Sequence, residues 1–188
     1  MRIKVYIKRI LGFVKCFKHH IKVNGNCYIG WRVKIINRGL FILGDHAQIR
    51  PLCAIFTHND FSELKIGKNS EIGQMSTISC FNRIIIGEGV LTGPHVFIGD
   101  NNHDYRNPNI HIYRQGVYAM PEDEIIIGDG TWLGTNVVVV GNVKIGKQCV
   151  IGANSVVNRD IPDYCVAVGM PCKVVRRYNW ENKQWEKT

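Results

Sequence analysis

The chain has 188 residues and a formal net charge of +9, and its length fits one domain. It contains no run of eighteen apolar residues, so we expect no membrane-spanning helix, and residues 1–20 are too broken by charge for a secretory signal. The excess charge lies at the two ends, whereas a basic face with aromatic side chains is not visible along the body, so we expect no nucleic-acid partner.

Residues 1–22 predict a basic amphipathic helix at the start of the chain. Apolar residues recur there at spacings of three and four, and lysines lie on the other side. Two compatible interpretations stay open: a cap packed over the domain that follows, and an interfacial helix at an anionic membrane surface. The apolar residues are Ile3, Ile7, Ile10, Leu11, Val14, Phe17 and Ile21.

Residues 23–162 carry a repeat of six residues. An aliphatic residue returns at every sixth position in the clearest run, and glycine comes directly after four of these six residues. The six aliphatic residues are Ile127, Leu133, Val139, Ile145, Ile151 and Val157. Neither a helical nor a simple strand period explains this pattern, and hexapeptide repeats belong to parallel β-helices. The sequence therefore predicts an all-β solenoid of triangular coils. Glycine after the aliphatic residue suits a corner with a positive φ or a close backbone approach.

A second inward position follows each aliphatic residue by four and should hold a small or medium side chain. Three of the seven cysteines, Cys27, Cys53 and Cys149, occupy it, and no C-x-x-C pair is present. We therefore expect buried free thiols in a reducing cytoplasm. In the clearest run this position holds Thr131, Val137, Val143, Cys149 and Ser155.

The repeat is interrupted at residues 56–65 and, at greater length, at residues 99–126. The longer break is rich in histidine, asparagine and tyrosine, and such loops carry sites without disturbing the coils. His103 lies where the regular repeat ends. Histidine changes charge near neutral pH and suits a general base, although a solvated loop histidine is the other interpretation. Residues 163–188 predict a closing turn and a short basic C-terminal tail.

Four segments in a fixed order, residues 86–103, 127–136, 145–157 and 168–176, resemble the hexapeptide-repeat acetyltransferases. That family has a left-handed parallel β-helix, and the chain is most similar to its galactoside, maltose and surface-polysaccharide sugar O-acetyltransferases. The resemblance implies an acetyl-CoA-dependent O-acetyltransferase that acts on a sugar hydroxyl, in surface-polysaccharide or glycolipid biosynthesis. It implies His103 as the general base and no covalent acyl-enzyme.

The resemblance also implies a binding site for acetyl-CoA. Without the resemblance, Trp132 could be an outward aromatic that covers a neighbour, and Lys173 and Arg176 could belong to a solvated basic tail. The match to the family places Trp132 and Thr135 on the pantetheine path and basic side chains at the phosphates, as a multiply anionic coenzyme requires. The implied set is Trp132, Gly134, Thr135, Gly152, Ala153, Asn158, Arg159, Lys173 and Arg176.

Acceptor binding is expected of Asn82, Asp100 and Asn102, which lie near the base in the repeat register. Two of them have other interpretations: Asn82 could lie inside the coil, and Asp100 could orient His103. Family members are homotrimers with active sites between subunits, which we expect here too.

Three other functions are weighed against this one. The trimeric zinc carbonic anhydrases share the fold, but the spacing of His95, His103 and His111 does not match theirs, so we expect no metal requirement. An N-acetyltransferase acting on a nucleotide-linked amino sugar is the main alternative. A non-catalytic hexapeptide-repeat scaffold is the other, although a scaffold has no use for the coenzyme-side residues.

The basic N-terminal helix would suit a lipid-linked acceptor at the inner face of the membrane.

Overall fold

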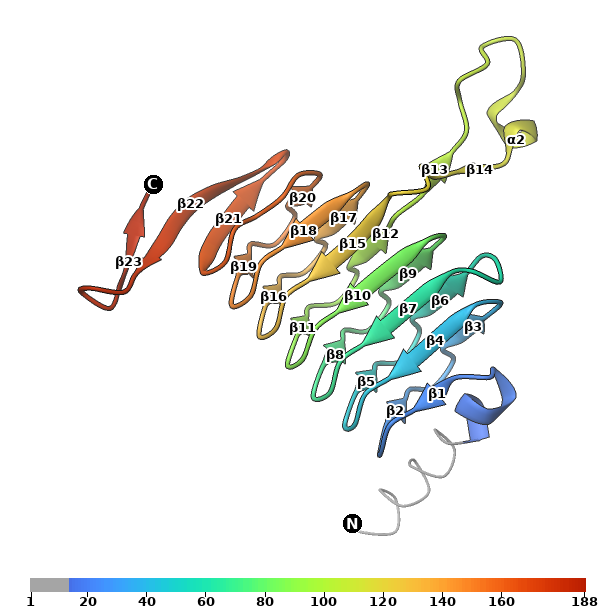
Figure 1. Ribbon diagram of the computed structural model, residues 1–188, viewed down its shortest axis with the longest axis horizontal. Helices are drawn as coiled ribbons and strands as arrows, with labels where there is room; N and C mark the ends of the chain where they lie inside the picture. The colour runs from blue at the N-terminus through green and yellow to red at the C-terminus, as the bar shows by residue number, and fades with distance from the viewer. Residues whose placement is uncertain (1–13) are drawn as a thin grey trace.

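A computed structural model describes residues 14–188, which wind into a left-handed parallel β-helix with three flat faces (Figure 1). Each face is one sheet, and each coil adds one strand to each sheet. Sheet A consists of β1 (Lys22–Val23), β4 (Leu40–Leu43), β7 (Glu63–Ile66), β10 (Arg83–Ile86), β15 (Glu124–Ile127) and β18 (Val143–Ile145).

The other two sheets follow in the same chain order around the coil. Sheet B consists of β2 (Tyr28–Ile29), β5 (Gln48–Ile49), β8 (Glu71–Ile72), β11 (Leu91–Thr92), β16 (Trp132–Leu133), β19 (Val150–Ile151), β21 (Cys165–Gly169), β22 (Cys172–Asn179) and β23 (Gln184–Lys187). Sheet C consists of β3 (Lys34–Ile36), β6 (Ala54–Thr57), β9 (Thr77–Cys80), β12 (Phe97–Gly99), β17 (Val138–Val140) and β20 (Val156–Val157).

The core is a set of aliphatic columns that run along the inside of the solenoid. Ile84 in β10 pairs in register with Leu64 in β7 and Ile125 in β15, and all three side chains are fully buried. The second inward position is buried as well, as the repeat predicted, at Thr131, Val137, Val143, Cys149 and Ser155. All seven cysteines are free and buried. Strand alternation thus buries one face of every coil and leaves the other outside.

The glycine after each aliphatic residue is explained by close packing and not by backbone conformation. Gly134 has no positive φ, but a Cβ built on it would lie 2.7 Å from the backbone nitrogen of Ala153 in the next coil. The left-handed conformation falls two residues later, at Asn136 and, one coil on, at Asn154. Of the two reasons that the sequence offered for glycine, the structure selects the close approach.

Residues 14–18 are helical and lie against the first coil, whereas residues 1–13 of the expected helix lie outside the described residues. Cys16 and Ile21 are buried, and Lys15 Nζ donates to the carbonyl of Gly30 at 2.5 Å. Phe17 is 82% exposed, so it does not pack on the first coil as a cap would require, and Cys16 takes the buried position instead. Within the described part of the chain, no helix is long and apolar enough to cross a membrane.

The C-terminal segment differs from the expected turn and tail. After β21, which pairs in parallel with β19, the chain reverses into β22 and β23, and both extend sheet B in antiparallel fashion. Edge-to-face ring contacts between Tyr178 and both Trp180 and Trp185 stiffen this hairpin, with centroid distances of 4.8 and 5.4 Å. The six-residue pattern stops here, which is why the ordered extension had no signal in the repeat.

Candidate active site

The long break in the repeat forms an arm, residues 100–123, that leaves the solenoid between β12 and β15 (Figure 1). Its stem is the two-residue antiparallel pair of β13 (Asn102–His103) and β14 (Val117–Tyr118), and its tip holds the short helix α2 (Ile112–Gln115). His103 pairs with Val117 in this stem, and its side chain is exposed. Asn102 beside it is also exposed. The structure thus presents the expected base to solvent on a short hairpin.

The arm is anchored at its first residue by a buried carboxylate. Asp100 is fully buried, and its two oxygens accept the backbone N–H groups of Phe81, Asn82 and Arg83 at 2.7 to 2.8 Å. The expectation that Asp100 binds the acceptor is therefore wrong, because both oxygens are occupied inside the protein. No contact with His103 is formed either. Asp100 is a structural anchor that fixes where the arm begins.

Asn82 holds the other end of the arm. Its amide nitrogen donates to the carbonyls of Met120 at 2.5 Å and Asp123 at 3.3 Å. The side chain lies at the corner and not inside the coil, because Cys80 takes the inward place. The amide nitrogen expected to meet a sugar is thus engaged by the arm.

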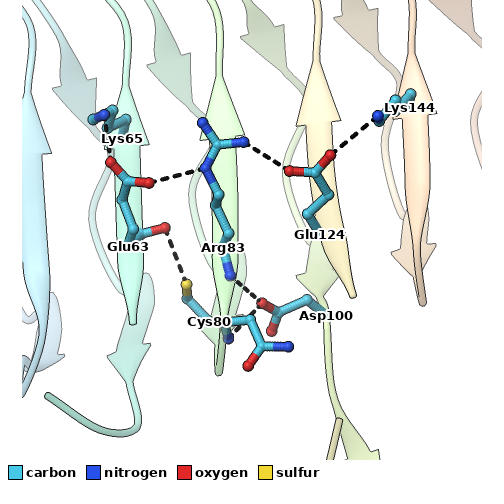
Figure 2. A network of polar contacts seen from close by, with 8 residues as sticks. Glu63, Lys65, Cys80, Arg83, Asp100, Glu124 and Lys144 are labelled. Atoms are coloured by element: carbon cyan, nitrogen blue, oxygen red, sulfur yellow. Dashed lines mark hydrogen bonds and ion pairs between the residues drawn. The ribbon is translucent and has the colours of Figure 1, made fainter. Parts of the chain in front are cut away.

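A row of ion pairs on sheet A connects the strands before and after the arm (Figure 2). Arg83 lies directly between Glu63 and Glu124 in the strand register, with contacts of 2.9 and 2.7 Å. Lys144 extends the row to β18 by a 3.1 Å contact with Glu124. Hydrogen bonds from Lys65 and then Arg83 lower the pKa of Glu63, and hydrogen bonds from Arg83 and then Lys144 lower the pKa of Glu124. Coils on either side of the arm therefore stay in register although about forty residues separate their strands.

Inside the arm, polar contacts replace an apolar core. Arg106 donates to both carboxylate oxygens of Asp104, at 2.9 and 2.5 Å, and its guanidinium lies 3.9 Å from the ring centroid of Tyr118. The Arg106 hydrogen bonds lower the pKa of Asp104 to about 2. Gln115 accepts from the backbone N–H of Asn107 at 3.0 Å and donates to its carbonyl at 2.9 Å. Local electrostatics and turns thus shape the hairpin that carries His103.

The expected donor residues fall on sheet B and its corner with sheet C. Trp132 in β16 is 49% exposed and pairs with the exposed Leu91 of β11. Thr135 and Ala153 are exposed at the corner between sheets B and C in successive coils. Trp132, Thr135 and Ala153 thus lie on two adjacent coils, and we refer to these three exposed residues as the strip.

Gly134 and Gly152 need no ligand to explain them. A Cβ on Gly134 would meet the backbone of Ala153, and a Cβ on Gly152 would lie 2.7 Å from Cγ1 of Val168. Stacking of one coil on the next therefore requires Gly134, whose Cβ would meet backbone atoms, whereas at Gly152 the side chain of Val168 is the only close neighbour. Their backbones still border the strip.

The remaining basic residues lie elsewhere on the molecule. Asn158 and Arg159 are exposed after β20, at the corner between sheets C and A, which is also the corner that carries the arm. Lys173 and Arg176 are exposed on β22, beyond the last coil. One chain therefore does not bring Trp132 together with Asn158 or His103, because a side of the triangular coil separates their corners.

Several surface hollows lie on sheet A. One of about 540 Å³ is lined by β15, β18 and their following corners and contains none of the predicted residues. Another of about 430 Å³ lies beside the arm, lined by Phe61, Asn82, Arg83 and Glu122 among others. Among the described residues, no group of three histidine, cysteine or acidic side chains could hold a metal ion.

The sequence interpretation leaves out one polar cluster beneath the arm, formed by His58, Ser79 and Asn101. These three residues are spaced by 21 and 22 positions, or about one coil, which is the signal that could have found them. His58 Nε2 lies 2.8 Å from Ser79 Oγ, and Asn101 Nδ2 donates to the same oxygen at 3.1 Å.

Comparisons with known proteins agree with this fold. A family model described as bacterial transferase hexapeptide (six repeats) matches residues 124–159. The chain is 31% identical over 166 residues to a putative lipopolysaccharide biosynthesis O-acetyl transferase of Escherichia coli K12, covering 85% of this chain and 71% of that relative. It is 33% identical over 156 residues to galactoside O-acetyltransferase of the same strain, covering 82% and 72%.

A solved structure shows the same architecture. An N-acyltransferase from Bacillus cereus in complex with dTDP and 3-hydroxybutyryl-CoA superimposes with a TM-score of 0.73 at 18% identity, over 89% of each chain. That likeness concerns the fold alone. The two Escherichia coli relatives carry the assignment, because each exceeds 30% identity over more than two thirds of both chains. The chain therefore belongs to the hexapeptide-repeat acetyltransferases and is an acyltransferase.

Proposed function

We propose that this protein transfers an acetyl group from acetyl-CoA to a sugar hydroxyl, with His103 as general base. The observation that carries the proposal is the exposed imidazole of His103, held on a hairpin whose first residue, Asp100, is locked to the coil below. The similarity to two O-acetyltransferases supports the reaction class. A general base has to be accessible and held near its substrate, and the exposure of His103 on an anchored hairpin supports this role.

In the proposed reaction, a ring nitrogen of His103 takes the proton of the acceptor hydroxyl as the oxygen attacks the thioester carbonyl. The tetrahedral oxyanion then collapses, the carbon–sulfur bond breaks, and the imidazolium returns its proton to the leaving CoA thiolate. A positioned base of this kind contributes about 10²–10⁴ in rate.

Direct transfer without an acyl-enzyme is supported by the state of the cysteines. All seven are buried, so no thiol is presented to a substrate. Burial is the largest cause that raises the pKa of Cys53, Cys80 and Cys149, which disfavours the nucleophilic thiolate.

The donor is proposed to follow the strip of Trp132, Thr135 and Ala153. Asn158 and Arg159 lie at another corner of the same chain, so their proposed place near the adenine end requires these residues from a neighbouring copy. Lys173 and Arg176 then meet the phosphates, since both are exposed on β22 and carry the required charge. If this is right, Lys173→Ala and Arg176→Ala weaken binding of CoA several-fold more than binding of dephospho-CoA, as measured by calorimetry. Arg177→Ala on the same strand is the control. Equal weakening of both ligands would remove the 3′-phosphate from this assignment.

A homotrimer is proposed because the expected residues lie on separate corners of one chain. The strip on sheet B and the arm that carries His103 can meet the same substrate if a neighbouring copy supplies the arm. Closed cyclic symmetry provides such a repeated contact. Sedimentation of the purified protein tests this, and a folded, active monomer would contradict it.

The acceptor is proposed to be a saccharide of a surface polysaccharide or glycolipid, bound with the help of the exposed Asn102. The basic N-terminal segment, in which Phe17 is exposed, would hold the enzyme at the cytoplasmic face of a membrane. Deletion of residues 1–20 should then abolish binding to anionic vesicles, and unchanged vesicle binding would dispose of this part.

The function is tested by release of free CoA thiol from acetyl-CoA in the presence of a panel of acceptors. We expect turnover with neutral glycosides or oligosaccharides, and an ester product by mass spectrometry. Turnover confined to nucleotide-linked amino sugars, with an amide product, would instead establish the N-acetyltransferase alternative. A folded protein that binds no CoA would favour the scaffold.

A further inference from the structure

Beneath the arm, three polar side chains from three successive coils form a hydrogen-bonded chain. His58 follows β6, Ser79 lies in β9, and Asn101 follows β12. His58 Nε2 lies 2.8 Å from Ser79 Oγ. Asn101 Nδ2 donates to Ser79 Oγ at 3.1 Å and to the Ser79 carbonyl at 2.8 Å. The chain ends at the residue directly before β13, the strand that carries His103.

The direction of these hydrogen bonds follows from the donors and acceptors present. Asn101 Nδ2 faces two oxygens of Ser79 and Asp100 Oδ1, so it is the donor. Ser79 Oγ accepts from Asn101, and its own proton has two acceptors within reach, His58 Nε2 at 2.8 Å and Asn101 Oδ1 at 3.4 Å, of which the shorter contact favours His58. In this arrangement His58 is neutral and carries its proton on Nδ1. Burial, the largest cause, lowers the pKa of His58; Arg38 adds to the lowering and Asp100 opposes it.

The ring faces of His58 have other contacts than its Nε2 atom, which meets Ser79. Phe56 and Phe81 flank the ring, with centroid distances of 6.2 and 6.1 Å. Phe81 is in turn tied to the arm, because its backbone N–H donates to Asp100. Ring packing and the Nε2 hydrogen bond are thus two distinct contributions, and different substitutions can remove them one at a time.

We propose that His58 is a positioning residue of the arm: through Ser79 and Asn101 it fixes the backbone that leads into β13, and so the direction in which His103 points. The proposal rests on the proposed role of His103 as base. His58 acts through other residues and is not itself the base, since its Nε2 is occupied by Ser79. A small displacement of a reacting group is enough to matter, because a misplacement of about 1 Å costs on the order of 10² in rate.

The test separates the ring from its nitrogen. His58→Phe keeps an aromatic ring between Phe56 and Phe81 but removes Nε2, whereas His58→Gln keeps a polar side-chain end near Ser79 but removes the ring. Ser79→Ala removes only the hydroxyl and serves if His58→Phe folds poorly. His46→Asn is the control, because His46 is exposed at another corner, contacts Asp45, and has a positive φ that asparagine tolerates.

Two readouts are compared: amide hydrogen exchange of the intact protein without substrate, and steady-state turnover. In His58→Phe and Ser79→Ala we expect exchange at residues 101–104 to rise about tenfold while residues 124–157 are unchanged. We also expect kcat to fall about tenfold at constant KM for acetyl-CoA, a loss well below the ~10² expected of a full 1 Å displacement. His58→Gln and His46→Asn should resemble the wild type in both readouts.

Four results would overturn the proposal. The first is an equal loss of kcat in His58→Gln and His58→Phe, and the second is faster exchange throughout the solenoid. The third is no change in exchange or kcat in His58→Phe and Ser79→Ala. The fourth is faster exchange at residues 101–104 with unchanged kcat. The first two would reduce His58 to a packing residue. Because exchange is read without substrate, it judges the position of the arm even if His103→Ala shows full turnover and the proposed base is wrong.

Discussion

The solenoid body and the arm are stabilised in opposite ways. In the body, columns such as Leu64, Ile84 and Ile125 are fully buried, and each strand is hydrogen-bonded to a strand on either side. In the arm, none of residues 101–123 is buried, and contacts such as Asp104–Arg106 are local and polar. The body therefore has its own apolar core, whereas the arm depends on its anchors.

This difference puts the proposed base, His103, in the region with fewer buried contacts. Segments with few buried apolar contacts open at low free energy, while core strands open only with the whole domain. The arm can move or be pressed into place by a substrate or a second subunit without disturbing the coils. The buried Asp100 marks the boundary between the two regions, because it belongs to the core by burial and to the arm by sequence.

The largest effect is expected from a cavity in the body. Ile84→Ala should lower the free energy of unfolding by about 2–5 kcal/mol, because a fully buried side chain is removed from the middle of a packed column. Ile85→Ala on the same strand, where the side chain points outward, is the matched control and should cost much less. Chemical denaturation measures both, and equal losses would contradict the inward and outward assignment.

A smaller effect is expected at the boundary. In the wild type, both carboxylate oxygens of Asp100 accept backbone N–H groups. In Asp100→Asn, the amide NH₂ group replaces one of these oxygens and cannot accept, so we expect the free energy of unfolding to fall by about 1–3 kcal/mol. Asp160→Asn is the control, because exposed Asp160 accepts only the N–H of Lys144. If Asp100→Asn were as stable as the wild type and its arm exchanged at the normal rate, Asp100 would not be the anchor.

The smallest effect is expected inside the arm. The pKa of Asp104 in the folded protein is about 2, below the value near 3.9 of an unfolded chain, so its contact with Arg106 is fully present above pH 4. It is lost as the pH falls toward 2. A carboxyl NMR titration should show this midpoint in the wild type and a return toward 3.9 in Arg106→Ala. An unshifted wild-type midpoint would mean that the pair does not persist in solution.

The body could be predicted from the sequence because its repeat records a physical constraint at every coil. Inward positions such as Val139 and Cys149 are buried, so they hold small or apolar side chains, and the residue type in the sequence indicates which positions face inward. The pattern also located the break that contains His103. It did not reveal why Gly134 is required, since its neighbour Ala153 lies one coil away. Nor did it predict β22 and β23, where the six-residue period has ended.

The site was less predictable because its contacts join different coils. Asp100 and Asn82 looked suitable for sugar hydroxyls by residue type, but their partners are backbone groups of the arm and its anchor. His58 gave no signal by itself, and its partner Ser79 lies 21 residues further along the chain. Polar residues at a corner can serve either the ligand or the loop, and only their geometry separates these roles.

The central claim is that His103 is the base that the arm presents. The most direct test compares kcat/KM of His103→Ala with that of His111→Ala, using the best acceptor of the panel. His111 is exposed on the same arm and makes no side-chain capping bond to α2, so its removal controls for general damage. We expect a loss of about 10²–10⁴ in His103→Ala and near-normal turnover in His111→Ala. A folded His103→Ala protein with full turnover would contradict the account.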